Sequence, residues 1–114
     1  MKIKKLQGFL KDRNIDIALF FDYDPNFKFF SGICVEHGCL VVPVSGRPSL
    51  FVPGFEVNHI APFTSAKVIA SERDFLRQIF GLFPAKRIGI FPNNISYSMV
   101  QWILDLWAKH PVMG

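Results

Sequence analysis

Apolar runs bounded by turn residues predict five strands. They cover residues 15–21, 38–44, 49–52, 66–70 and 87–91. The first run is apolar at nearly every position and stops at Asp22, which is typical of a strand buried on both faces. The second and third flank the turn residues 45–48 and so predict a hairpin. Pro43 indicates an edge position or a strand end, because proline donates no ladder hydrogen bond.

Between these strands, apolar residues recur at helical spacing and predict helices. The helices cover residues 2–13, 25–30, 55–61, 71–83 and, after a cap at Asn94 or Ser96, the stretch to Trp107. Pro62 is expected to stop the third helix. Ser71 and Asp74 resemble a capping box at the start of the fourth. Strands that alternate with helices, interrupted by one hairpin, favour an α/β domain with a mixed sheet.

The segment Asp24–Gly32 has a defined start and stop of its own. Asp24 can cap free N–H groups, and Pro25 suits the first helical position because its missing N–H would be unpaired there anyway. Phe27 and Phe30, three residues apart, share a helix face. The segment therefore predicts a short helix directly after the first strand.

Four landmarks in order resemble the creatinase/prolidase N-terminal domain, which belongs to Xaa-Pro dipeptidases and aminopeptidases P. The first is the opening helix followed by Ile15-Asp16-Ile17-Ala18-Leu19, and the second is Asp24-Pro25-Asn26 through Ser31-Gly32. The third is the stretch 50–56, and the fourth is Lys86-Arg87-Ile88-Gly89-Ile90. Their spacing and order agree with that family over nearly the entire chain.

The resemblance implies a fold rather than a reaction. We expect a three-layer α/β/α domain of ribonuclease H-like topology with a mixed, about five-stranded sheet, occupying residues 1–114 as a single domain. In that family a later pita-bread domain carries the hydrolase chemistry, with two divalent metal ions such as Mn or Co. Its ligands lie beyond residue 114, so we expect no catalytic residue, metal ligand or cofactor in this chain.

Bulk composition raises the question of partners. Half of the residues are hydrophobic, 13 are phenylalanine, and mean hydropathy is +0.26, so apolar surface is expected to meet a second copy or a catalytic domain. A tightly packed core is the alternative. No membrane span or signal peptide is recognisable, and a cytoplasmic location with reduced thiols is expected.

A net charge of +4 would suit a nucleic-acid partner, but a simpler explanation is stronger. The positive residues near the N-terminus are explained by the solvated face of an amphipathic helix.

Candidate site residues follow the Ser31-Gly32 pair. In the resembled family, this position reaches toward the active site of the partner subunit, which makes Glu36 and His37 substrate-entrance candidates by position. Cys34, His37 and Cys39 also form a C-x2-H-x-C pattern that zinc would accept, but no further ligand stands at matching spacing. These cysteines are better explained as a loop residue and a small strand residue.

A nuclease interpretation rests on Asp16, Asp22 and Asp24 near the first strand. We reject it, because two-metal nucleases need converging carboxylates and no further acidic residue is placed to join them.

Three functions follow from these patterns. The first is a non-catalytic N-terminal domain of a prolidase-like metallopeptidase, contributing to dimerisation and to the entrance for proline-containing peptides. The second is a stand-alone module of the same fold that binds peptides or proteins or self-associates. The third, nucleic-acid binding, is the weakest of the three.

Overall fold

A five-stranded mixed sheet forms the centre of the structure, a computed structural model that describes residues 2–22, 25–83 and 87–89. The strands are β1 (Ile17–Phe21), β2 (Cys39–Pro43), β3 (Ser49–Val52), β4 (Lys67–Ala70) and β5 (Ile88–Gly89). Their order in the sheet is β4-β3-β2-β1-β5. β1, β2 and β3 pair antiparallel as a meander, while β4 pairs parallel to β3 and β5 parallel to β1. The expected mixed sheet and the hairpin are confirmed.

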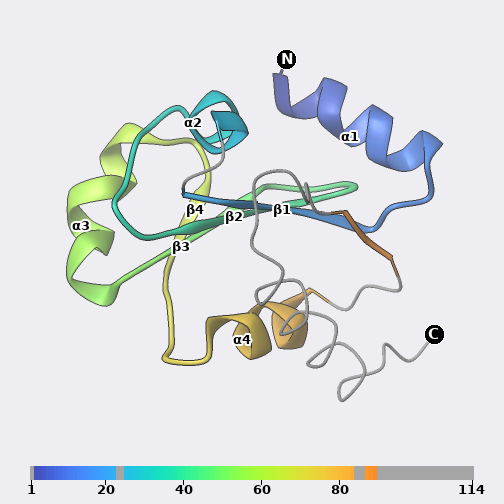
Figure 1. Cartoon of the computed structure of the whole chain (residues 1–114). Helices are drawn as coiled ribbons and strands as arrows, with labels where there is room; N and C mark the ends of the chain where they lie inside the picture. Colours follow the sequence, from blue (N-terminus) through green and yellow to red (C-terminus); the bar gives the residue numbers. More distant parts are fainter. Residues whose placement is uncertain (1, 23–24, 84–86, 90–114) are drawn as a thin grey trace.

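Helices cover both faces of this sheet and complete a three-layer α/β/α arrangement (Figure 1). They are α1 (Lys2–Asp12), α2 (Pro25–Ser31), α3 (Val57–Ile60) and α4 (Phe75–Leu82), with 3-10 turns η1 (Gly54–Glu56) and η2 (Ala61–Phe63) on either side of α3. α1 and α2 lie over one face with α3 beside them, and α4 lies under the other. The fold class expected from the sequence is confirmed.

Alternate residues of each central strand enter two separate cores. Ala18 and Phe20 of β1 face the α1, α2 and α3 side, where Leu10, Phe27 and Ile60 cover them. The intervening β1 residues face α4 and pack against its buried apolar residues, which are Leu76, Ile79 and Phe80. This alternation of faces explains why the sequence of β1 is apolar at every position.

The short helix predicted from its own boundary residues is α2. Phe27 is fully buried, and the ring centroids of Phe30 and Phe20 are 5.2 Å apart, so both helix residues pack toward the sheet. After Ser31 the chain turns at Gly32, whose φ of +83° is a conformation that glycine adopts without steric cost. The Ser31 hydroxyl donates to the Ile33 carbonyl at 3.0 Å and accepts from the Ile33 N–H at 3.3 Å. Side chain and glycine together end the helix.

The predicted start of the fourth helix is wrong. Ser71 does not cap α4, because its N–H extends the sheet by donating to the Val52 carbonyl, and α4 begins four residues later at Phe75. Asp74 occupies the N-cap position but makes no capping bond, and its carboxylate pairs with Arg77 instead. The prediction that the third helix stops before Pro62 is confirmed for α3, which ends at Ile60; a 3-10 turn, η2, follows with Pro62 in its first turn, where the missing N–H costs nothing.

Pro43 lies at the end of β2, a central strand, so the strand-end alternative is the one observed. The predicted last helix, the strand end at residues 90–91 and the Asp24 cap lie outside the described residues. In the described part of the chain, no helix has the length and apolar character to cross a membrane.

Candidate functional site

The carboxyl ends of four strands meet at one edge of the sheet. β1, β3, β4 and β5 run in the same direction, because the two outer pairs are parallel and β2 alone is reversed. The loop before β2 and the η1–α3 segment after β3 therefore lie at this edge. In open α/β sheets, this is where ligands bind.

The first hollow at this edge is a polar cleft of about 320 Å³. We call it the entrance cleft. Its lining residues are Cys34, Val35, Glu36, His37, Pro53, Phe55, Glu56 and Ile60. The first four come from the loop after Ser31-Gly32, and the others come from the segment that follows β3. The two substrate-entrance candidates, Glu36 and His37, are thus side by side in the lining of one cleft.

Charge in the entrance cleft is predominantly negative. Glu36 comes from the loop before β2 and Glu56 from η1, and neither carboxylate has an ion pair or side-chain hydrogen bond among the described residues. His37 is exposed and offers an imidazole that can donate or accept a hydrogen bond. A ligand with both an ammonium and a carboxylate group would find suitable partners here.

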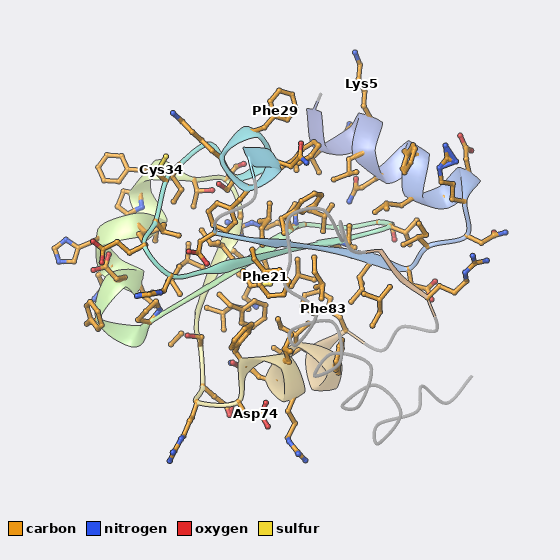
Figure 2. The ribbon with its side chains drawn as sticks, viewed as in Figure 1. Lys5, Phe21, Phe29, Cys34, Asp74 and Phe83 are labelled. Atoms are coloured by element: carbon orange, nitrogen blue, oxygen red, sulfur yellow. The ribbon has the colours of Figure 1, made fainter. Side chains whose placement is uncertain are left out.

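A second hollow of about 200 Å³, which we call the aromatic cavity, adjoins the first. Phe21, Phe51 and Phe75 line it together with Asp22, His37, Gly38, Cys39, Pro53 and Ser71. His37 and Pro53 line both hollows, so they form the boundary between them. Figure 2 shows Phe21 on the α4 side of the sheet, whereas Cys34, in the entrance cleft, lies at the loop near α3.

The two cysteines do not form a metal site. Cys34 is exposed, Cys39 is buried among apolar residues of the α4 face, and both thiols are free. Burial, together with the nearby charge of Asp22, raises the pKa of the Cys39 thiol and so keeps it protonated. Within the described ranges, no three histidine, cysteine or acidic side chains come close enough to hold a metal ion.

The aspartates behind the nuclease interpretation lie far apart. Asp16 precedes β1 and Asp22 follows it, which separates them by roughly 20 Å at the usual rise of an extended chain. Asp16 also has a structural function, because its carboxylate accepts a hydrogen bond from the Arg87 N–H at 3.0 Å. Asp24 lies outside the described residues.

A comparison with protein-family models decides the family. The Creatinase/Prolidase N-terminal domain model matches residues 2–109. This chain belongs to that family. No match was found among curated proteins.

Solved structures of creatinase/prolidase N-terminal domains have the same fold. The creatinase/prolidase N-terminal domain of an X-Pro dipeptidase from Streptococcus pyogenes is 19% identical with a TM-score of 0.78, and the match covers 94% of this chain and 88% of that one. The N-terminal domain of cytoplasmic peptidase PepQ from Mycobacterium tuberculosis is 19% identical with a TM-score of 0.80, covering 95% and 85%.

A prolidase from Pyrococcus furiosus is 22% identical with a TM-score of 0.73. The match covers 88% of this chain but 29% of that prolidase. The domain therefore corresponds to less than a third of the length of that relative.

Sequence reasoning missed several residues of this edge. Glu56 and Phe55 were recognised only as part of a family landmark, and Asp22 only as a strand terminator. Their contribution depends on the direction of β3 and on the position of η1, because these bring the segment after Pro53 opposite the loop of Glu36. The landmark at residues 50–56 was the one available signal.

Proposed function

We propose that this creatinase/prolidase N-terminal domain is the non-catalytic part of a prolidase-like Xaa-Pro dipeptidase and that its entrance cleft helps to admit the substrate. The observation that carries the proposal is the placement of Glu36 and His37. The loop that follows Ser31-Gly32 lines a cleft together with Pro53, Phe55 and Glu56, which belong to the family landmark at residues 50–56.

The size and charge of the cleft support this function. A volume of about 320 Å³ is at the lower end of the roughly 300–1,000 Å³ typical of small-ligand pockets. A dipeptide carries an ammonium group that Glu36 or Glu56 would attract and a carboxylate to which His37 can donate an N–H. In this proposal the chain binds and orients the substrate, while two divalent metal ions in a separate catalytic domain supply the hydrolytic chemistry.

Dimerisation is the second part of the proposal. Phe55 and Phe63 are 78% and 73% exposed; Phe55 lines the entrance cleft, and Phe63 ends the η1–α3–η2 segment that starts there. Large exposed aromatic side chains at a site rim are characteristic of protein contacts. A second copy or a catalytic domain seated on this segment would place its own surface beside the cleft. We propose a cytoplasmic setting for such an assembly.

The first experiment tests catalysis and substrate admission separately. The chain with Mn²⁺ or Co²⁺ and Leu-Pro should release no proline, and release by the pure chain would refute the non-catalytic assignment. Amide NMR shifts during Leu-Pro titration should instead appear at Glu36, His37 and Glu56. His37→Ala should weaken this binding, whereas His59→Ala should not, because His59 is also exposed but lines neither hollow.

The outcomes separate the proposal from its alternative. Equal binding by the two histidine variants would remove the entrance role. Binding of internal proline-containing segments as strong as that of Leu-Pro would favour the stand-alone module. Sedimentation should show a concentration-dependent dimer that Phe63→Ser weakens, and a strict monomer would contradict dimerisation through the chain itself.

A further inference from the structure

The aromatic cavity has the size and lining of a binding site for one apolar group. Phe21 and Phe51 are buried in the core on the α4 face of the sheet, and Phe75, the first residue of α4, forms a T-shaped ring pair with Phe21 at a centroid distance of 6.4 Å. An engineered apolar cavity of about 150 Å³ is known to hold a benzene ring. At about 200 Å³, the aromatic cavity is large enough for one ring or a branched aliphatic group.

Core residues of the α4 face form one side of this cavity. Phe21, Cys39 and Phe51 are buried in that core, and Phe75 packs against it. The ring of Phe51 also contacts that of Phe83, at a centroid distance of 6.5 Å. The Gly38 carbonyl accepts a hydrogen bond from the Asp22 N–H at 3.1 Å, which joins the end of β1 to the loop before β2. A ligand would therefore enter a space whose inner side is already formed by the core.

The charge at this cavity is negative although the chain as a whole is positive. The Asp22 carboxylate is half-buried in the lining and has no ion pair or hydrogen bond among the described residues. Among the residues that the structure describes, no lysine or arginine lines either hollow. The charge of Asp22 is felt inside the cavity, because it contributes to the raised pKa of Cys39. A cation would therefore be favoured over a neutral or anionic group of the same shape.

We propose that the aromatic cavity binds an ammonium group carrying one apolar substituent, with the substituent between Phe21, Phe51 and Phe75 and the charged nitrogen at Asp22. The aromatic rings can contact both the apolar substituent and the charge of such a cation, and the carboxylate can pair with its charge. An apolar N-terminal residue of a peptide has this chemistry. His37 and Pro53 lie between the cavity and the entrance cleft, so the following residue would lie at that boundary.

The test compares three ligands that share one ring and differ in charge. Benzylammonium, benzyl alcohol and benzoate are titrated into the chain while the amide NMR signals are followed. Saturable shifts at Asp22, Gly38, Ser71 and Phe75 are expected with benzylammonium alone. Equal binding of benzyl alcohol would overturn the role of Asp22, and no binding of any of the three would overturn the site.

Two variants and their matched controls locate the ligand. Asp22→Asn should weaken benzylammonium binding by about three- to tenfold, the range expected for a partly exposed ion pair with a cation–π contribution. Asp12→Asn removes the same charge from the exposed end of α1 and should have no effect. Phe75→Leu should also weaken binding, and Phe9→Leu on α1 should not. Unchanged binding by Asp22→Asn or by Phe75→Leu would overturn the proposal.

A final arm identifies the source of the amine. Phenylalanine amide has a charged ammonium group, which its N-acetyl derivative replaces with a neutral amide. Binding of the free form with shifts that extend to Glu36 and Glu56 would assign the cavity to peptide N-termini, whereas shifts confined to the cavity would assign it to small amines. Equal binding of the free and the N-acetylated ligand would count against both assignments. The site stands even if Leu-Pro fails to bind at the entrance cleft, so the two proposals fail separately.

Discussion

At Gly38, one added methyl group should lower the folding stability of the domain through a direct steric clash. A Cβ at this residue would lie 2.9 Å from Cγ2 of Val35 and 3.3 Å from the Phe51 carbonyl oxygen. The first distance is shorter than real Cβ contacts allow, and the second involves backbone of the sheet. The φ angle of Gly38 is not positive, so the cost is steric rather than conformational.

The expected penalty for Gly38→Ala is about 1–3 kcal/mol, as for other overpacked cores. For a domain of this length, that corresponds to a fall in Tm of roughly 4 °C per kcal/mol. Thermal and urea unfolding followed by circular dichroism measure it. Gly8→Ala provides the matched control, because its Cβ has no neighbour within 4 Å and helix propensity should stabilise the variant by about 0.5–1 kcal/mol.

A double variant tests the assigned cause. Val35→Ala removes the closest clashing atom, so Gly38→Ala should cost less in the Val35→Ala background than in the wild type. The interaction free energy from this cycle should be about 0.5 kcal/mol or more for residues in contact. The steric argument would be refuted if the unfolding free energies of the two substitutions were strictly additive. It would also be refuted if Gly38→Ala were as stable as the wild type.

Three further perturbations probe other parts of the fold. Phe27→Ala should destabilise the domain by about 3–5 kcal/mol, whereas Phe29→Ala, at a 53% exposed position of the same helix, should cost far less; equal melting temperatures would contradict the assigned packing of α2. Cys34 should react with a thiol reagent in the folded chain and Cys39 only after unfolding, since burial raises the pKa of Cys39 and blocks access; two fast thiols in the native state would disprove this. Gln7→Ala removes two hydrogen bonds, to the Pro43 and Gly46 carbonyls, and should cost about 1 kcal/mol in urea unfolding; an unchanged midpoint would show that water replaces both.

The sequence predicted the layers of the fold well because its strong signals are local. The run that becomes β1 is apolar on both faces, and the turn residues before Pro48 define the hairpin without help from distant contacts. Predictions failed where the sheet competes with a local motif. Ser71 has the side chain of a helix cap, yet its N–H bonds to Val52, and only the parallel pairing of β3 with β4 brings that carbonyl into reach.

The candidate site was predictable where its signal is local, and not where it depends on the sheet. Glu36 and His37 were reached through family position after Ser31-Gly32. Their neighbour Glu56 is 20 residues away in the numbering and comes close only because β3 ends at the same edge as β1. The aromatic cavity gave no sequence signal at all, since its phenylalanines are indistinguishable from core residues until the space between them is seen.

The pairing of β1 with β5 has a consequence for folding during synthesis. Asp16 and Arg87 exchange hydrogen bonds across a separation of 71 residues, and they join β5 to the outer edge of the most apolar strand. On a ribosome, β1 through β4 can assemble from neighbouring segments while that edge still waits for its partner. An unpaired apolar edge is the surface on which nascent chains associate with one another. The last pairing of the sheet therefore determines how long each new copy of this domain is exposed to aggregation.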